Sequence, residues 1–181
     1  MTVYSHSRLN TYENCPLQYK LKYIDRVKVD RPASIEAFVG SRVHETFEKL
    51  YKDLLMEKLN SKKELLQYFN DIWEKHWDDD ILIVKDGYSE ENYRKTGERC
   101  ISNYYDSHKP FNHSKTLGIE DRIVLDLDGT GNYKLQGYID RIAQNGSTYE
   151  VHDYKTSSHL PLQKHLDEDR QLALYSIGIK E

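Results

Sequence analysis

Two aspartates and a lysine in the C-terminal part of the chain have the residue types that metal and phosphate chemistry use. Asp140 lies in the string GYIDRI, and Asp153 and Lys155 lie two residues apart in HDYKTS. Residues two positions apart in a strand point to the same face, so Asp153 and Lys155 would share one. Carboxylate oxygens are the usual ligands of hard divalent cations, and an adjacent ammonium group can stabilise negative charge.

The residues around these acids have the composition of strands. The ranges 120–127, 133–143 and 148–155 are rich in Ile, Val, Leu and Tyr. Asp128-Gly129 and Asn145-Gly146 supply hairpin turns between them, because glycine readily takes the positive φ that such turns need. We therefore expect an antiparallel meander.

The second turn decides whether the two aspartates meet. A two-residue turn at Asn145-Gly146 would place Asp140 opposite Val151 and Tyr138 opposite Asp153. The two aspartates are then diagonal neighbours on one face, about 7 to 8 Å apart at the backbone. A loop of odd length would reverse this parity and separate them.

Two carboxylates held this close need a partner of opposite charge. At about 6 Å they repel by about 3 kcal/mol, which is large against the stability of a domain. Lys155 could offset the repulsion as a structural ion pair, or a divalent cation could bind both acids. Geometry alone leaves these two alternatives equal.

The first half of the chain is predicted to be helical. Ser5 or Ser7 could cap a short helix that reaches Asn14, and Pro16 suits the first turn of a second helix. In the next helix apolar residues recur every three or four positions, which indicates one buried stripe, and His44 lies on this helix. Longer helices are expected over the ranges 33–60, 62–77, 90–107 and 166–179.

Composition predicts one domain with a hydrophobic core. The chain has 181 residues, of which 38% are hydrophobic and 31% charged. It begins with neither a basic nor an apolar run, and Cys15 and Cys100 are too few for a disulfide framework, so we expect a cytoplasmic protein with no membrane partner. The net charge of -4 argues against indiscriminate coating of nucleic acid. Basic residues and tyrosines interleave over 1–32, which suits either nucleic acid or an amphipathic surface helix.

Five strings together carry a resemblance to a known family. GYIDRI (137–142), HDYKTS (152–157) and QLALY (171–175) resemble the C-terminal motifs of the PD-(D/E)XK nuclease superfamily. SHSRLNTYENCPLQYKLKYI (5–24) and VGSRVHETFEKLY (39–51) resemble motifs of its RecB/AddB-type branch, which includes the nuclease domains of helicase-nucleases and CRISPR-associated exonucleases. The resemblance implies an α/β fold with a restriction-endonuclease-like core: a mixed sheet with an antiparallel meander flanked by helices, behind an N-terminal helical part.

The resemblance also implies roles for individual residues. The metal ligands fall on His44, Asp140, Asp153 and the main-chain carbonyl of Tyr154, and the catalytic lysine falls on Lys155. Asp140 and Asp153 are therefore catalytic as well. The implied cofactor is Mg²⁺ or Mn²⁺, which activates water and stabilises the charge that develops on phosphate.

Further positions are expected to contact DNA. Gln171 and Tyr175 lie one helical turn apart, and the resemblance implies that they support the lysine and touch the nucleic acid. Arg8, Tyr12 and Tyr19 are candidate DNA contacts in the N-terminal motif, although the two tyrosines suit a core equally well.

Two further residues lie near the predicted ligands. Glu120 opens the first strand and could face the site as an extra acidic ligand through water, although its register is undetermined. His152 lies next to Asp153 and would point to the opposite face by strand alternation, so it is not expected to be a ligand.

The sequence departs from the family in its cysteines and its C-terminal end. Many relatives hold an iron-sulfur cluster with one cysteine in the N-terminal motif and three near the C-terminus. Cys15 stands at the first position, but with Cys100 as the only other cysteine no such cluster can form within this chain alone. The family's core usually continues beyond the 171–175 motif, so we expect a C-terminally truncated chain, a minimal member, or a fragment with an exposed sheet edge.

The resulting prediction is a metal-dependent deoxyribonuclease that hydrolyses phosphodiester bonds, with single-stranded DNA ends as substrate in repair or recombination. We expect a single nuclease domain over 1–181, with a helical part over about 1–110 and a strand-rich catalytic core over about 117–181. The alternative is a non-catalytic DNA-binding or docking module of a helicase-nuclease or CRISPR-adaptation assembly.

Overall fold

The computed structural model of the chain describes residues 2–28, 32–157 and 162–179. The chain divides into two compact units, which we describe separately. Unit 1 comprises Met1–Asp30, Glu120–Ile139 and Leu160–Glu181, and unit 2 comprises Arg31–Ile119 and Asp140–His159. Strands β2 and β3 each begin in one unit and end in the other.

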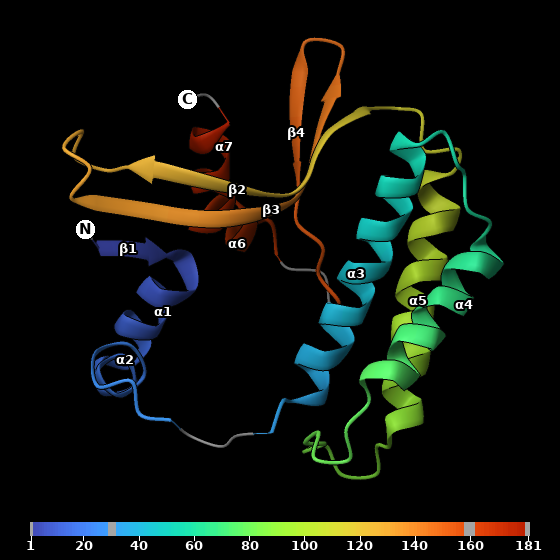
Figure 1. Cartoon of the computed structure of the whole chain (residues 1–181), viewed down its shortest axis with the longest axis horizontal. Coiled ribbons are helices and arrows are strands. Elements are labelled where there is room, and N and C mark those ends of the chain that lie inside the picture. Colours follow the sequence, from blue (N-terminus) through green and yellow to red (C-terminus); the bar gives the residue numbers. More distant parts are fainter. Residues whose placement is uncertain (1, 29–31, 158–161, 180–181) are drawn as a thin grey trace. The chain divides into compact units, whose positions relative to one another are not determined.

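A short strand comes first along the chain, helices follow, then further strands, and short helices end it (Figure 1). In chain order the elements are β1 Thr2–Ser5, α1 His6–Asn14, α2 Pro16–Tyr19, the π-helical turn η1 Lys20–Ile24, α3 Ile35–Leu55, α4 Lys62–His76, α5 Glu90–His108, β2 Lys115–Asp126, β3 Tyr133–Asn145, β4 Thr148–His152, α6 Gln163–Asp167 and α7 Arg170–Gly178.

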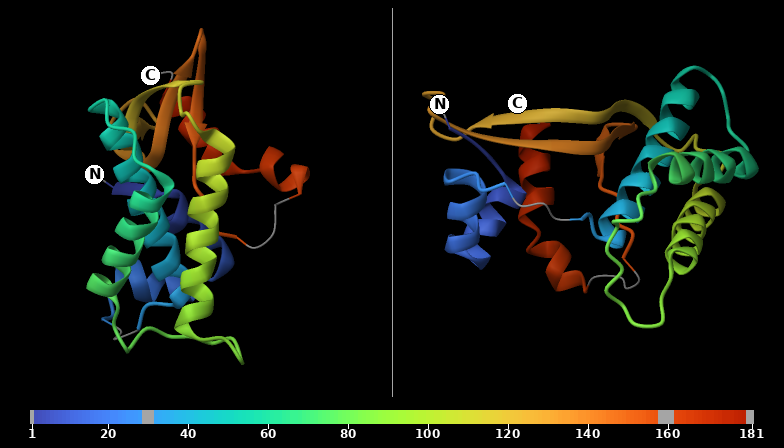
Figure 2. Two further views of the ribbon diagram at one scale, coloured as in Figure 1. Left: turned by 90° about the vertical axis from the view of Figure 1, so that its right-hand side faces the viewer. Right: turned by 60° about the horizontal axis from the view of Figure 1, so that its bottom comes forward.

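Unit 2 is built on the long helices α3, α4 and α5, which lie side by side in both views of Figure 2. The apolar stripe predicted for α3 is confirmed, because its members pack into one buried cluster with residues of α4 and α5. The buried members of this cluster on the three helices include Ile35, Val39, Val43, Phe47, Leu50, Leu65, Phe69, Trp73, Ile101 and Tyr105.

The helix boundaries follow the capping chemistry of the sequence. Ser5 caps α1 by accepting the N–H of Arg8, and Ser61 forms a capping box with Glu64 at the start of α4. The prediction that α3 reaches about residue 60 is wrong, because the helix ends at Leu55. The chain turns back there, with φ of 60° at Glu57.

The sheet is mixed and has four strands, with β1, β3 and β2 in that order and β4 paired to β3. β1 runs parallel to β3, with Thr2 opposite Tyr133, and β3 runs antiparallel to β4. The expected mixed sheet with a meander and flanking helices is therefore confirmed. The sequence reading missed β1, because four residues directly before a helix carry little periodicity.

The β3–β4 register corrects the predicted turn. Asn145 pairs with Thr148, so the two loop residues are Gly146 and Ser147, and Ile142 rather than Asp140 lies opposite Val151. Gly146 takes the first loop position with a φ of 59°. The register differs from the expected one by an even number of positions, so the predicted parity of facing residues is unchanged within the ladder, which ends at Arg141 and His152.

β4 is shorter than predicted. The last pair of the β3–β4 ladder is Arg141 with His152, and β4 ends there. The expectation that this strand continues to Lys155 is wrong. Residues 153–155 continue beyond the ladder without pairing as a strand, so strand alternation does not decide where their side chains point.

The predicted C-terminal helix over 166–179 is two helices. α6 ends at Asp167 and α7 begins at Arg170, because the Asp169 side chain accepts the N–H groups of Gln171 and Leu172 as an N-cap. The sequence also predicts a polar loop over 157–164 before these helices. Its residues 158–161 lie outside the described residues, and Gln163 and Lys164 already belong to α6.

Within unit 1, α7 lies against the strands β2 and β3. A Cβ atom added to Gly137 would meet the ring of Tyr175 at 2.6 Å, and one added to Gly178 would meet Ile123 at 2.7 Å. Glycine at these positions allows helix and sheet to approach closely.

Among the described residues, no helix combines the length and the apolar character that a bilayer crossing requires. Cys15 and Cys100 form no disulfide. The cytoplasmic location stays a prediction.

Candidate metal centre

His44, Asp140 and Tyr154 form a closed set of contacts within unit 2. His44 projects from α3, and its Nδ1 lies 3.3 Å from Oδ1 of Asp140 on β3. Its Nε2 lies 2.7 Å from the carbonyl oxygen of Tyr154. The N–H of Tyr154 donates to Oδ2 of Asp140 at 2.6 Å. The main chain of Tyr154 thus holds both the imidazole and the carboxylate.

These contacts put the His44 ring between two oxygen atoms. A neutral imidazole carries hydrogen on one nitrogen and a lone pair on the other. Because both nitrogens face an acceptor oxygen, one lone pair must face the lone pairs of an oxygen. Either a second proton on the ring or a cation coordinated by nitrogen and oxygen removes this repulsion.

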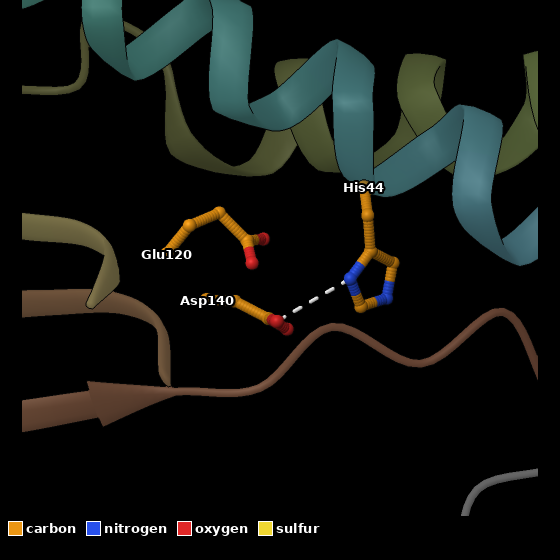
Figure 3. A group of neighbouring side chains, drawn as sticks. All are labelled: His44, Glu120 and Asp140. Carbon is orange, nitrogen blue, oxygen red and sulfur yellow. Dashed lines mark ion pairs between the residues drawn. The ribbon is translucent and has the colours of Figure 1, made fainter. Parts of the chain in front are cut away.

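Glu120 supplies a second carboxylate to this group. Figure 3 shows its carboxylate directed toward Asp140 and the ring of His44. One possible ligand atom from each of the three residues lies within 4.8 Å of the others. Glu120 was expected only as an extra ligand of undetermined register. The strand β2 begins at Lys115 rather than at residue 120, so Glu120 lies within the strand and not at its first position.

The backbone at Glu120 adopts an unusual conformation for a strand. Its φ is 53°, in the left-handed region that residues other than glycine rarely adopt. A left-handed residue interrupts the regular alternation of side chains along β2. Such outliers persist where the surrounding structure holds them, and they concentrate at functional sites.

The chemistry of these donors fits a hard divalent cation. Two carboxylates within 4.8 Å repel by about 3 kcal/mol at an effective dielectric of about 20. Asp140 is only 9% exposed, so water screens this repulsion poorly. Carboxylate oxygens together with one imidazole nitrogen are a ligand set for Mg²⁺ or Mn²⁺.

Asp153 and Lys155 form an ion pair with each other. The Asp153 side chain is 12% exposed and that of Lys155 is 60% exposed. Asp153 is not among the three residues whose ligand atoms lie within 4.8 Å. The structure therefore joins the predicted ligands His44, Asp140 and Tyr154 and brings Glu120 close to His44 and Asp140. It pairs the predicted ligand Asp153 with the predicted catalytic Lys155.

An aromatic cluster supports the main chain at the site. The Tyr154 ring packs edge-on against Phe47, Tyr104 and His44, with centroid separations of 4.8, 5.5 and 5.9 Å. Burial raises the pKa of the Tyr154 hydroxyl well above its usual range, so this side chain stays neutral. The ring therefore acts as a packed anchor for the carbonyl and N–H that hold His44 and Asp140.

Gln171 and Tyr175 belong to unit 1. Nε2 of Gln171 donates to the Tyr175 hydroxyl at 2.6 Å, so the two side chains meet as their spacing predicted. Tyr175 is 6% exposed and packs beside Gly137 on β3. Their proposed support of Lys155 and contact with nucleic acid stay predictions.

The candidate DNA contacts near the N-terminus pack on one another. The Arg8 guanidinium lies 5.1, 5.4 and 5.0 Å from the ring centroids of Tyr4, Tyr19 and Tyr23. Its Nη1 donates to the carbonyl of Val3 and its Nε to the Tyr19 hydroxyl. These contacts tie β1 to the helical turns that follow it.

Tyr12 differs from Arg8 and Tyr19 in its exposure. Its side chain is 55% exposed and meets Tyr19 edge-on at 5.3 Å. Both tyrosines were expected to suit either a core or a DNA surface. Tyr12 is the more accessible of the two. DNA binding by all three residues stays a prediction.

Comparison with models of protein families identifies a match. A family model described as the PD-(D/E)XK nuclease superfamily covers residues 3–181. The mixed α/β structure is consistent with the restriction-endonuclease-like fold of that family, as the sequence predicted. No curated protein matches the chain.

Proposed function

This chain belongs to the PD-(D/E)XK nuclease superfamily, and on that premise we propose that it is a metal-dependent deoxyribonuclease that hydrolyses phosphodiester bonds. The observation that carries the proposal is the convergence of His44, Glu120 and Asp140 within 4.8 Å. Carboxylates held this close destabilise the fold when no cation is bound. With a divalent cation bound, the same group can activate water for hydrolysis.

In this proposal each residue has a separate task. His44, Asp140, Asp153 and the carbonyl of Tyr154 hold a divalent ion, and Glu120 contributes a further carboxylate. When bound, the ion lowers the pKa of a water molecule and polarises the scissile phosphate. Water attacks phosphorus, the bond to the leaving oxygen breaks, and Lys155 stabilises the charge that develops on the phosphate oxygens. This requires Lys155 to exchange its partner Asp153 for the substrate.

We further propose Mg²⁺ or Mn²⁺ as the cofactor and single-stranded DNA ends as the substrate, within the RecB/AddB-type branch and a role in repair or recombination. The motifs quoted above support this finer assignment. Gln171 and Tyr175 would support the lysine and, with Arg8, Tyr12 and Tyr19, contact DNA. A helicase or a CRISPR-adaptation protein would be the partner, and residues 1–181 would act as one nuclease domain.

Cleavage of end-labelled single-stranded DNA tests the activity. With Mg²⁺ or Mn²⁺ the wild type should release labelled products, while Asp153→Ala and Lys155→Ala should each be at least about 100-fold slower. Asp71→Ala and Lys164→Ala are matched controls on exposed helix positions and should cleave like the wild type. Equal cleavage by all five proteins would contradict the assignment. Resistance of circular single-stranded DNA would distinguish an exonuclease from an endonuclease.

The alternative, a non-catalytic DNA-binding or docking module, is favoured by one observation. Lys155 already has a carboxylate partner in Asp153, as a structural ion pair would. Calorimetry with Mn²⁺ separates the two functions. A module of this kind should bind DNA, and Asp140→Ala should remove no Mn²⁺ binding from it. The nuclease should bind Mn²⁺, and Asp140→Ala should abolish that binding.

A further inference from the structure

Arg141 lies next to the ligand Asp140 but points away from it, into a buried polar cluster of unit 2. Its side chain is almost inaccessible, at 2% exposure. Nε donates to Oγ1 of Thr116 at 2.9 Å, and Nη2 donates to Oγ of Ser114 at 2.9 Å. Nη1 lies 3.2 Å from Nε2 of His152, and the guanidinium lies 4.1 Å from the ring centroid of Tyr51.

The composition of this cluster is unusual for a buried cation. Burying a charge is costly unless hydrogen bonds or opposite charges replace its hydration. The direct partners of Arg141 are hydroxyl groups, the carbonyl oxygen of Ser114, an imidazole and an aromatic face. The carboxylate of Glu150 lies beside this cluster, 3.2 Å from Nε2 of His152. A planar fork of five donors can satisfy such a spread of acceptors, which a lysine ammonium cannot do.

Each partner belongs to a chain segment that also carries a residue of the metal centre. Ser114 directly precedes β2 and Thr116 is its second residue, and β2 is the strand that carries Glu120. His152 is the last residue of β4, directly before Asp153 and Tyr154. Tyr51 lies on α3, on the helix that carries His44. One guanidinium therefore joins all the segments that bring ligands together.

A second connection runs through the aromatic cluster. The hydroxyl of Tyr51 lies 2.6 Å from that of Tyr104, and the Tyr104 ring packs against Tyr154 with centroids 5.5 Å apart. Tyr154 in turn holds His44 and Asp140 with its main chain. A shift of the Arg141 side chain would therefore reach the ligands through packed rings as well as through the backbone of β3.

We propose that Arg141 is a positioning residue of the metal centre: it fixes the spacing of the ligand-bearing segments and thereby sets the affinity for the cation. This inference rests on the proposed function, because it assumes that the centre binds a divalent ion. Groups behind metal ligands commonly change metal affinity about 10- to 100-fold when they are replaced. A purely structural role would lower the stability of the fold and leave the affinity of the folded protein unchanged.

The test measures Mn²⁺ binding by the electron paramagnetic resonance signal of free Mn²⁺, at a temperature where circular dichroism shows each variant folded. Arg141→Lys keeps the charge but loses the fork, and Thr116→Val removes one acceptor with little change in shape. Arg122→Lys is the matched control, because Arg122 is an exposed arginine on β2 whose guanidinium donates to Gln136. DNA cleavage is measured in parallel at rising Mn²⁺ concentration.

We expect Arg141→Lys to raise the Mn²⁺ Kd about 10- to 100-fold, Thr116→Val to raise it by a smaller factor, and Arg122→Lys to leave it unchanged. Excess Mn²⁺ should restore much of the cleavage by Arg141→Lys. A Kd within about twofold of the wild type in both cluster variants would overturn the inference.

Two other outcomes are also decisive. If Arg141→Lys does not fold, Thr116→Val alone decides, with weaker Mn²⁺ binding supporting the role and unchanged binding overturning it. If the wild type binds no more Mn²⁺ than Asp140→Ala, the proposed function itself fails, and the inference fails with it.

Discussion

At the scale of single residues, the main chain of Tyr154 organises the site. Its carbonyl and N–H reach His44 and Asp140, while its ring is buried among aromatic side chains. Rigid support of this kind fixes the positions of ligands before a cation arrives. Lys155 follows directly, with a side chain that is 60% exposed and so accessible to a polyanionic substrate.

The first residue-scale prediction separates chemistry from metal binding. Lys155→Met should lower the rate of DNA cleavage at saturating Mn²⁺ by about 100-fold or more, because the charge that develops on phosphate loses its ammonium partner. The Mn²⁺ Kd should remain close to that of the wild type, since the lysine is no ligand. Rapid-quench kinetics and calorimetry measure the two quantities. A large loss of Mn²⁺ affinity would assign Lys155 to the metal site instead.

The second residue-scale prediction concerns Glu120. Glu120→Gln should weaken Mn²⁺ binding about tenfold or more, because the centre loses a negative charge while the side chain keeps its shape. Asp121→Asn, on the neighbouring exposed position, is the matched control and should bind as the wild type does. Calorimetry measures both. Unchanged binding by Glu120→Gln would remove Glu120 from the ligand set.

At the scale of elements, close helix packing keeps the His44 helix in place. Gly97 on α5 is buried where α5 meets α4, and an added Cβ would lie 2.4 Å from Cζ of Phe69. Phe69 is fully buried and cannot swing away. A side chain larger than hydrogen therefore has no room at this contact.

Gly97→Ala should destabilise the protein by about 1 to 3 kcal/mol, because overpacking at Phe69 exceeds the gain in helix propensity. Gly40→Ala on α3 is the matched control: its Cβ would lie 3.6 Å from Oγ1 of Thr156, an ordinary contact. That variant should be unchanged or more stable by up to about 1 kcal/mol. Urea unfolding measures both, and equal stability of the two variants would contradict the packing argument.

A pH-dependent contribution is expected at the end of α3. The hydrogen bond from Lys49, with further bonds from Asn60 and Lys58, lowers the pKa of Asp53 from 3.8 to about 2. The folded state thus favours the carboxylate, so its contribution is present above about pH 4 and is lost as the pH falls toward 2.

We therefore expect Asp53→Asn to lose about 1 kcal/mol of stability at pH 7, allowing for solvent screening, and this loss to disappear between pH 4 and 2. Asp71→Asn, at an exposed position of α4, should follow the wild type throughout. Urea unfolding across this pH range is the measurement. A constant difference between Asp53→Asn and the wild type would show that the carboxylate's charge is not responsible.

At the scale of the whole molecule, the site is assembled from distant parts of the sequence. Its ligands come from a helix in the first half and from strands in the second. A cation that binds them only in the folded state must stabilise the fold by mass action. Binding and folding are therefore linked across the chain.

Mn²⁺ at about 100 times its Kd should add about 3 kcal/mol to the free energy of unfolding and raise the Tm by several degrees. A chelator should reverse the shift, and Asp140→Ala should show none. Differential scanning calorimetry with and without Mn²⁺ is the measurement. An equal shift in the wild type and in Asp140→Ala would place the stabilising ion elsewhere.

Elements that depend on local chemistry could be predicted from the amino-acid sequence. The α3 stripe, the helix start at Ser5, the helix beginning at Lys62 and the turn in the Asn145-Gly146 region follow from side-chain periodicity, capping and φ preference, which act over a few residues. The family motifs added the identity of His44 and Asp140 as partners. Local signals were weaker at boundaries, so the end of α3, the length of β4 and the division between α6 and α7 were missed.

Which groups meet at the site depends on the three-dimensional packing of the chain. Glu120 joins His44 and Asp140 because β2 begins at Lys115 and takes a left-handed turn at Glu120, which no local pattern announces. Likewise Arg141 reaches Ser114 and Thr116 because long-range packing brings the start of β2 beside β3. Such contacts depend on strand register and on side-chain burial across the whole fold. The spacing of residues along the sequence does not contain this information.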